Sequence, residues 1–417
     1  MTMALWLGSL VPFYGVTLWG VYRGGRTRND HLMAFVVTGC FGVYGLLGAG
    51  ALLAWQARWP VLVGLGLGAA LLAPPFVMLA RRRDPGRGLG WWLMLASQPA
   101  YAFAFWGGCV LGIWLVSTLA TGAASFWPGP WLWVALALAL WGSVWGLALG
   151  QRVLRLRVEV PRARGPGLRL LQLSDIHFGP GFPLWKLRAL CDQAAALAPD
   201  LVLITGDLVG PFSDSPGEHD GLVETLAALP APVLFCPGNH DMPRWRTLGP
   251  ELRAGGVTVL EDETVCLDVA GERVWVLGVG FPWGRARVPA AEVIRGAVPP
   301  DDASLRLVLS HGPAVLDHLS ADSADMGFAG HTHGGPVSLG MLGLPVSILR
   351  LTASHDKGLH HRGGVWHYVH SGNWLIGMPP RIGTAPEIVV VEVVPSAGPA
   401  QEGLFARDEL QVDRSAR

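Results

Sequence analysis

The 417-residue sequence carries little charge and few cysteines. Asp, Glu, Lys and Arg make up only 15% of the chain, with 31 basic and 31 acidic residues, while 51% of it is hydrophobic. So hydrophobic a composition excludes a disordered chain, and the absence of net charge excludes a nucleic-acid binder that relies on a basic surface. Five cysteines in a chain of this length exclude a disulfide-dense mini-domain.

Acidic residues are almost absent from the first 150 residues, which hold only Asp30 and Asp84 against eight arginines, a net charge of +6. The remainder has 23 basic and 29 acidic residues, a net charge of −6. A helix needs ~20 residues to cross the hydrocarbon core of a membrane. Apolar runs of that length or more occupy roughly residues 4–22, 32–55, 60–80, 90–119 and 130–150. We therefore expect a multi-span transmembrane helical domain of about five helices over residues 1–150, with 13 of the 19 tryptophans in it.

Arginine is unevenly distributed among the segments between these runs. It is plentiful after the first, third and fifth runs and scarce after the second and fourth. Because basic loops stay on the cytoplasmic side, this alternation predicts an integral multi-pass protein of a bacterial-type inner membrane with a cytoplasmic C-terminal domain. If the long run 90–119 crosses twice or not at all, the domain lies outside. Three cysteines in the second part, Cys191, Cys236 and Cys266, lack metal-type spacing and suit a reducing compartment.

The second part of the chain alternates expected strands and helices. We expect a basic linker at 151–167, an α/β domain at 168–395 and a polar tail at 396–417. Strands are expected at 168–173, 201–205, 233–236, 274–279, 305–309, 326–329, 365–369 and 388–394, with a helix at 183–197. Such a mixture predicts sheets flanked by helices, with the chemistry on loops at strand ends.

Five of the expected strands are each followed by an imidazole, a carboxylate or a carboxamide. The residues are Asp175, His177, Asp207, Asn239, His240, Asp241, His311, His331 and His333. Neutral imidazoles, carboxylates and an amide oxygen suit divalent ions such as Mn, Fe, Zn or Mg, and the absence of cysteine argues against a structural zinc site. The set suffices for two ions that share a carboxylate and clamp a phosphoryl group, with a further histidine to protonate the leaving oxygen.

In order and spacing, these motifs resemble the calcineurin-like metallophosphoesterase superfamily. The motifs are Asp175-Ile-His177, Gly206-Asp207, Gly238-Asn239-His240-Asp241, His311 and Gly330-His331-Thr332-His333. The apolar segment ahead of them, with Gly334-Gly335-Pro336 and Pro386-Glu387-Ile388, resembles the branch called transmembrane protein with metallophosphoesterase domain. The resemblance implies a four-layer α/β/β/α sandwich over residues 168–395.

The resemblance also implies a role for each motif residue. The first metal ion would be bound by Asp175, His177 and His333, and the second by Asn239, His311 and His331. Asp207 would bridge the two ions. His240 would contact phosphate and act as general acid, steadied by Asp241.

Some positions depart from the pattern of the superfamily. A second aspartate commonly stands three residues after the bridging one and orients the catalytic histidine, but Gly210 occupies that position here, which leaves Asp241 or Asp214 as alternatives. The segment Val369–Asn373 replaces an expected arginine-containing stretch. A second group of histidines, for which surface or structural roles are favoured over a third metal ion, comprises His355, His360, His361 and His367.

These observations predict a metal-dependent phosphoric ester hydrolase with two divalent ions, Mn²⁺ first, held against membrane lipids. By resemblance to members of the branch, the first candidate substrate is UDP-2,3-diacylglucosamine, a pyrophosphate of lipid A biosynthesis. One alternative is a broad-specificity phosphodiesterase or phosphomonoesterase that acts on soluble or phosphoprotein substrates. Another is a non-catalytic membrane sensor or scaffold, against which the intact set of candidate ligands counts. We expect no nucleic-acid partner.

Overall fold

The computed structural model describes residues 151–179, 182–210, 219, 221–281, 289–335, 355–374 and 384–396, with isolated helical positions between 113 and 137. Within these ranges, no helix is long and apolar enough to cross a membrane. The five expected spans lie, apart from those isolated positions, outside the described residues, as does the expected tail from residue 397 onward. The strands all belong to the unit that contains residues 148–376 and 381–417.

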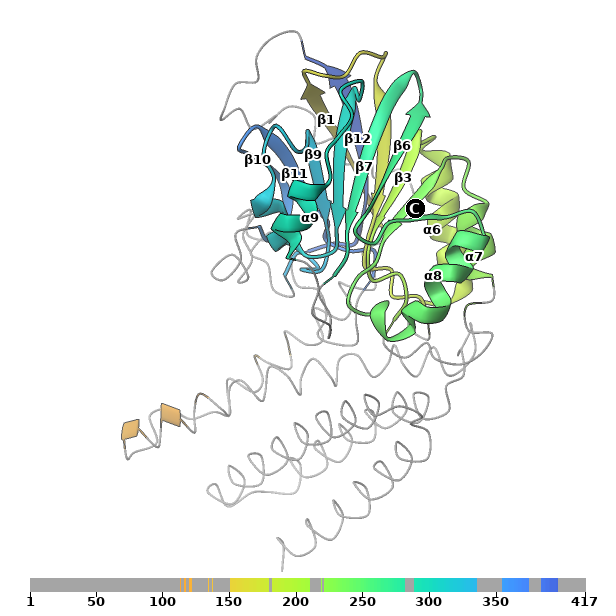
Figure 1. Cartoon of the computed structure of the whole chain (residues 1–417). Helices are drawn as coiled ribbons and strands as arrows, with labels where there is room; N and C mark the ends of the chain where they lie inside the picture. The colour runs from red at the N-terminus through yellow and green to blue at the C-terminus, as the bar shows by residue number, and fades with distance from the viewer. Residues whose placement is uncertain are drawn as a thin grey trace, which may run out of the picture. The chain divides into compact units, whose positions relative to one another are not determined.

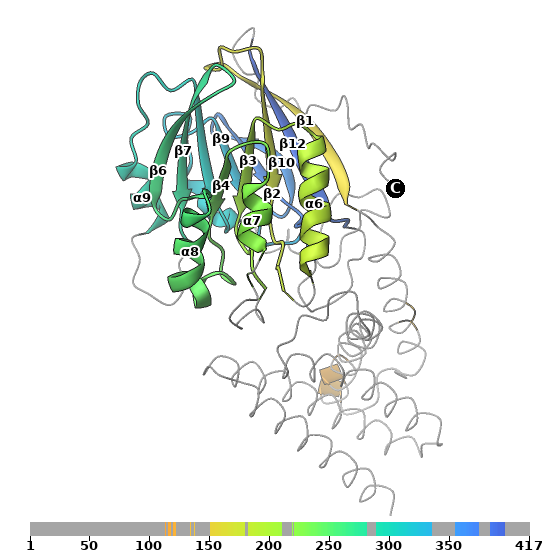
Figure 2. The same ribbon diagram turned by 90° about the vertical axis from the view of Figure 1, so that its right-hand side faces the viewer.

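One mixed sheet carries helices on its outer face (Figures 1 and 2). Its strands, in spatial order, are β1 (Arg152–Val160), β12 (Glu387–Pro395), β2 (Leu168–Leu173), β3 (Leu201–Thr205), β4 (Val233–Cys236) and β5 (Thr258–Val259). β2 to β5 run parallel, whereas β12 is antiparallel to β2. The helices are α6 (Leu184–Ala196), α7 (Leu222–Ala227) and α8 (Trp245–Ala254), the last preceded by the 3-10 turn η1 (Met242–Arg244).

A second mixed sheet packs against the first. Its order is β10 (Gly358–Arg362), β11 (Val365–Val369), β9 (Met326–Ala329), β8 (Leu305–Ser310), β7 (Glu272–Val279) and β6 (Glu263–Val269). The four central strands are parallel, and both edge strands are antiparallel to their neighbours. α9 (Ala290–Gly296) and the 3-10 helix η2 (Pro313–His318) cover the outer face.

Alternation along the strands builds three apolar layers. In β2, Leu171 and Leu173 face the helices, whereas Leu168 and Leu170 belong to the core between the sheets. Residues of the second sheet such as Phe328 complete that central core. A third cluster joins the second sheet to α9 and η2. The described domain is therefore an α/β fold in which two mixed sheets pack face to face between helices, as expected.

The segment expected as a basic linker was wrongly assigned over most of its length, because residues 152–160 form the edge strand β1. Every other residue of RVLRLRVEV is apolar, and Leu154, Leu156, Val158 and Val160 pack on the core between the sheets. β1 pairs in parallel with β12, so that Val158 lies opposite Val393. Arg155 and Arg157 occupy the other face of the strand, and their charge is what suggested a linker.

Candidate metal centre

The predicted site residues lie on five loops at the carboxyl ends of parallel strands. The loops follow β2, β3 and β4, which are neighbours in one sheet, and β8 and β9, which are neighbours in the other. Backbone hydrogen bonds join the loops, because the Asp175 N–H donates to the Gly206 carbonyl and the His177 N–H donates to the Asp207 carbonyl, each at 3.0 Å. The topology therefore brings together residues that are up to 158 positions apart in the sequence.

The backbone turns sharply at these loops. Five candidate ligands have left-handed φ angles, which non-glycine residues rarely adopt: Asp175 at 53°, His177 at 51°, Asp207 at 52°, His331 at 70° and His333 at 51°. Such conformations cost about 1–3 kcal/mol each and persist only where the surrounding structure imposes them. The strain is thus concentrated where the side chains converge, as expected of a functional site.

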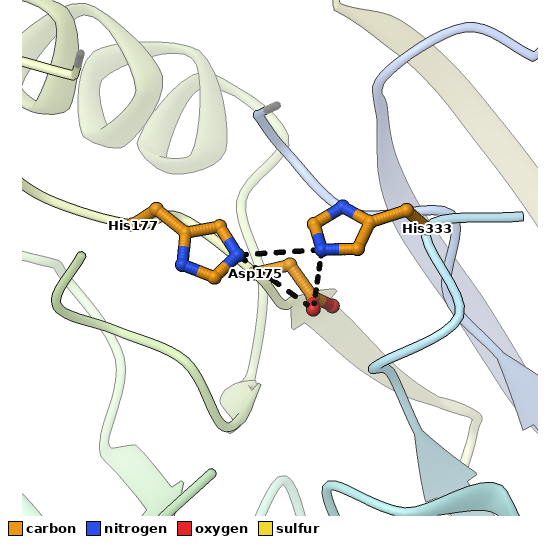
Figure 3. Close-up of side chains that lie close together, drawn as sticks. All are labelled: Asp175, His177 and His333. Atoms are coloured by element: carbon orange, nitrogen blue, oxygen red, sulfur yellow. Dashed lines mark hydrogen bonds and ion pairs between the residues drawn. The ribbon is translucent and has the colours of Figure 1, made fainter. Parts of the chain in front are cut away.

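A first group consists of Asp175, His177 and His333 (Figure 3). The Nε2 atoms of the two imidazoles are 3.3 Å apart, and His333 Nε2 lies 3.3 Å from Asp175 Oδ1. His177 Nε2 lies 4.0 Å from the same oxygen. Two imidazole nitrogens and a carboxylate oxygen therefore face a common point, as the ligands of one metal ion do.

A second group consists of Asp207, His311 and His331. His311 Nε2 lies 3.2 Å from Asp207 Oδ2 and 3.2 Å from His331 Nδ1. The two groups are contiguous, because the same Asp207 oxygen is 3.8 Å from His177 Nε2 of the first group. Asp207 thus lies between the groups, where a bridging carboxylate would be.

Asn239 supplies a donor that fits a metal ion. Its Oδ1 is buried and accepts no hydrogen bond from the described residues. Its neighbours on both sides contact Asp207: the His240 N–H donates to Asp207 Oδ1 at 2.8 Å, and Gly238 is in close approach to the same oxygen. An amide oxygen buried without a partner costs free energy unless another ligand satisfies it.

The structure places His240 beside the groups and gives Asp241 a different contact from the one expected. His240 Nε2 lies 3.9 Å from Asp207 Oδ2, and its ring meets the His177 ring edge-on. The Asp241 carboxylate accepts hydrogen bonds from the Val209 N–H at 3.0 Å and the Gly238 N–H at 2.8 Å. Asp241 thus joins its own loop to the loop after β3, and in the described part of the chain no hydrogen bond between Asp241 and the His240 ring is found. Asp214 lies outside the described residues.

A family model described as Calcineurin-like phosphoesterase matches residues 168–335, which contain all of these groups. The chain carries a calcineurin-like phosphoesterase domain. The resemblance found in the motifs is thereby confirmed, and the family supports metal-dependent hydrolysis of phosphoesters as the chemistry of the domain.

Curated relatives extend the likeness. The chain is 28% identical over 255 residues to "Phosphodiesterase YaeI" of Escherichia coli (strain K12), covering 58% of this chain and 88% of the relative. It is 24% identical over 242 residues to "UDP-2,3-diacylglucosamine pyrophosphatase LpxG" of Chlamydia trachomatis, covering 45% of this chain and 70% of the relative. It is 27% identical over 263 residues to "Transmembrane protein with metallophosphoesterase domain" of Danio rerio, covering 55% of each chain. The last name supports the suspected branch, and the chain spans about half the length of that relative.

Burial and the Asp207 carboxylate set the protonation of the phosphoesterase site. Burial disfavours the protonated form of His177 more than the negative charge of Asp207 favours it, and the pKa of His177 is lowered to about 3. Burial disfavours the protonated form of His311, but the negative charge of Asp207 and its hydrogen bond to the ring have the larger effect and raise the pKa of His311 to about 10. Burial disfavours the charged form of Asp207, yet His311 holds the pKa of the Asp207 carboxyl well below its usual range. Burial and the neighbouring Asp207 raise the pKa of Asp241 to about 7.

Two residues for which the sequence predicted no role, Ser174 and Asn373, support the phosphoesterase site from behind. The Ser174 hydroxyl donates to Asp175 Oδ2 at 2.7 Å, and the Ser174 N–H donates to Asn373 Oδ1 at 2.9 Å. Asn373 is the last residue of the segment Val369–Asn373, which departs from the expected arginine-containing stretch. That departure was the sequence signal that could have pointed to Asn373. These contacts fix the orientation of the carboxylate that faces His177 and His333.

Substitution of Gly238 by alanine is expected to weaken metal binding and phosphoesterase activity. A Cβ atom there would lie 2.3 Å from Asp207 Oδ1 and 2.9 Å from His311 Cδ2, so that both side chains would have to move. Metal content after gel filtration and hydrolysis of bis(p-nitrophenyl) phosphate check this. Gly296→Ala is the matched control, because nothing lies within 4 Å of a Cβ at that position. Equal metal content in the two variants would contradict the expectation.

Proposed function

We propose that this chain is a membrane-anchored hydrolase that uses two divalent metal ions, Mn²⁺ first, to cleave a phosphodiester or pyrophosphate bond. The observation that carries the proposal is the pair of contiguous His and Asp groups around Asp207. In this assignment Asp175, His177 and His333 hold one ion, and Asp207 bridges. The second ion is held by Asn239, His311 and His331.

The donors present fit such a pair of ions. Carboxylates, imidazoles and the buried Asn239 oxygen are ligands that borderline and hard divalent ions accept. When bound, the two ions stabilise charge on the phosphoryl oxygens and lower the pKa of a water that can attack. The left-handed backbone conformation of five of the ligand residues fixes the direction of their side chains before substrate binds. Little reorganisation of the ligands therefore accompanies the reaction.

His240 protonates the leaving oxygen in this proposal. It lies beside both groups, and its side chain is 26% exposed, so that a substrate can reach it. Burial lowers the pKa of His240. A phosphate substrate adds negative charge next to the ring and favours the protonated form, which a general acid requires.

A lipid-linked nucleotide is the proposed substrate, with UDP-2,3-diacylglucosamine first. The apolar runs of residues 1–150, which we propose as the membrane domain preceding the catalytic domain of residues 168–395, support it. The names of the relatives from Chlamydia and Danio rerio support it further. Tethering to the membrane raises the effective concentration of the site toward lipids. The arginine pattern supports a cytoplasmic catalytic domain.

The test is hydrolysis by the detergent-purified full chain of UDP-2,3-diacylglucosamine and of bis(p-nitrophenyl) phosphate, with Mn²⁺ and with EDTA. We expect EDTA-sensitive cleavage of the lipid pyrophosphate at a higher kcat/KM than that of the generic ester. Cleavage of the generic ester alone would overturn the lipid substrate and favour the broader phosphodiesterase activity. The name of the Escherichia coli relative supports that alternative. Failure to cleave either compound would overturn the hydrolase and favour a sensor.

A further inference from the structure

The chain enters the catalytic domain at the edge of the first sheet where candidate metal ligands lie. β12 is antiparallel to β2, and β1 is parallel to β12, so that both β1 and β12 begin where β2 ends. The loop after β2 carries Asp175 and His177. Gln151 is the residue immediately before β1, and it follows directly on the residues 1–150 that we propose as the membrane domain. The point of entry is therefore beside the phosphoesterase site.

The Gln151 carboxamide holds both the backbone and the side chain of Asn373. Gln151 Nε2 donates to the Asn373 carbonyl at 2.7 Å, and Asn373 Nδ2 donates to Gln151 Oε1 at 3.3 Å. Because a carbonyl can only accept, the nitrogen of Gln151 must face it, which leaves the oxygen for the Asn373 amide. Asn373 is fully buried, and its Nδ2 also donates to the Glu387 carbonyl at 2.7 Å. Gln151 is thus one of the groups that fix Asn373.

Asn373 and the residue after it in turn hold Ser174 and Asp175. The Ser174 N–H donates to Asn373 Oδ1 at 2.9 Å, and the Asn373 N–H donates to the Ser174 carbonyl at 2.8 Å. The Trp374 N–H donates to the Asp175 carbonyl at 3.1 Å. This N–H and the Asn373 carbonyl belong to one planar peptide group, so that the bond from Gln151 and the bond to Asp175 are made by opposite sides of the same rigid unit.

Asp175 is the candidate ligand on which these contacts converge. Its backbone has a left-handed φ of 53°, a conformation that persists only where the surrounding structure imposes it. Its carboxylate accepts a hydrogen bond from the Ser174 hydroxyl at Oδ2, at 2.7 Å, and presents Oδ1 to His333 Nε2, at 3.3 Å. The contacts that begin at Gln151 therefore reach both the backbone and the carboxylate of Asp175.

We propose that Gln151 is a positioning residue for the first metal ion, and that it ties the affinity of the Asp175 group for that ion to the way the chain enters the catalytic domain. The inference rests on the two-ion function proposed above. Outer contacts that orient a ligand change metal affinity by about 10–100-fold when they are removed. The second group is oriented by other bonds, among them that of His311 Nδ1 to the Thr205 carbonyl at 2.8 Å. Loss of the Gln151 contacts should therefore weaken one of the two ions.

Calorimetric titration of the metal-free, detergent-purified full chain with Mn²⁺ tests the proposal. Gln151→Met keeps the length of the side chain but has no N–H to donate, and Gln193→Met, at an exposed position on α6, is the matched control. We expect one of the two Mn²⁺ dissociation constants to rise about 10–100-fold in Gln151→Met alone. Equal constants in the two variants would overturn the role of Gln151 and leave the two-ion function standing. An unaltered chain that binds no Mn²⁺ would overturn the proposed function and this inference with it.

A double-mutant cycle separates positioning of Asp175 from a general loosening of the domain. Ser174→Ala removes the hydroxyl that donates to Asp175 Oδ2, and it is measured alone and together with Gln151→Met. Because both changes act on the same ligand, their losses of Mn²⁺ affinity should be less than additive, whereas additive losses would overturn the proposal. The midpoint of thermal unfolding in EDTA should be equal in Gln151→Met and Gln193→Met. A lower midpoint in Gln151→Met would assign Gln151 a merely structural role.

Discussion

Replacement of Asp207 by alanine is expected to abolish tight binding of the two metal ions and to reduce phosphodiester hydrolysis at least ~10³-fold. Asp207 is 1% exposed, and its Oδ2 lies 3.2 Å from His311 Nε2 and 3.8 Å from His177 Nε2. Its carboxylate is thus the group common to both ligand sets. Without the Asp207 carboxylate, Asp175 would be the one carboxylate left in the two groups to balance the positive charge of two divalent ions. Elemental analysis and kcat/KM measure the two effects.

Two further variants separate loss of charge from collapse of the loop. Asp207→Asn keeps an oxygen that can accept the hydrogen bond from the His240 N–H, which now reaches Asp207 Oδ1 at 2.8 Å. We expect it to fold as the unaltered chain does and still to bind metal poorly. Asp268→Ala removes an acid whose side chain is 75% exposed, and it should change neither measurement. Full metal content and turnover in Asp207→Ala would refute the two-ion assignment.

Local sequence was sufficient to predict the strands that position the site. Largely apolar segments predicted strands at residues 168–173, 201–205, 233–236 and 326–329, and the structure has β2, β3, β4 and β9 at these bounds. The candidate ligands follow such strands directly, so their convergence could be inferred from the rule that parallel strands end at one edge. Six of the seven predicted ligands accordingly fall into the two groups.

Features that depend on long-range pairing could not be inferred from the sequence. The place of β1 at the edge of the sheet depends on its partner β12, more than 220 residues later. Ser174 and Asn373 meet across 199 positions, and the facing of His360 and His367 depends on the register of a hairpin. Asp241 follows His240 in the sequence, yet its carboxylate accepts hydrogen bonds from Val209, on the loop after β3, and from Gly238, on its own loop. In each case the contact depends on tertiary structure and is not determined by neighbours in the sequence.

Replacement of His240 by alanine should leave both metal ions bound and slow hydrolysis by about 10²–10⁴-fold, the contribution of a positioned general acid. His240 belongs to neither metal group, and its backbone N–H, rather than its ring, holds Asp207. The side chain can therefore be removed without removing a ligand. Metal content and single-turnover rates give the two measurements, and His318→Ala, at an exposed position on η2, is the control.

The leaving group distinguishes acid catalysis by His240 from a purely structural role. p-Nitrophenolate departs without a proton, whereas an alkoxide needs one, so the defect in His240→Ala should be small for bis(p-nitrophenyl) phosphate and large for an alkyl phosphodiester. A side chain that only maintained the shape of the loop would affect both substrates equally. Asp241 anchors loops and Gly210 supplies no carboxylate, so that the carboxylate found near the His240 ring in the described residues is that of Asp207, with its Oδ2 3.9 Å from His240 Nε2. An unequal defect would therefore show that the His240 ring acts as the acid, whereas an equal defect would assign it a structural role.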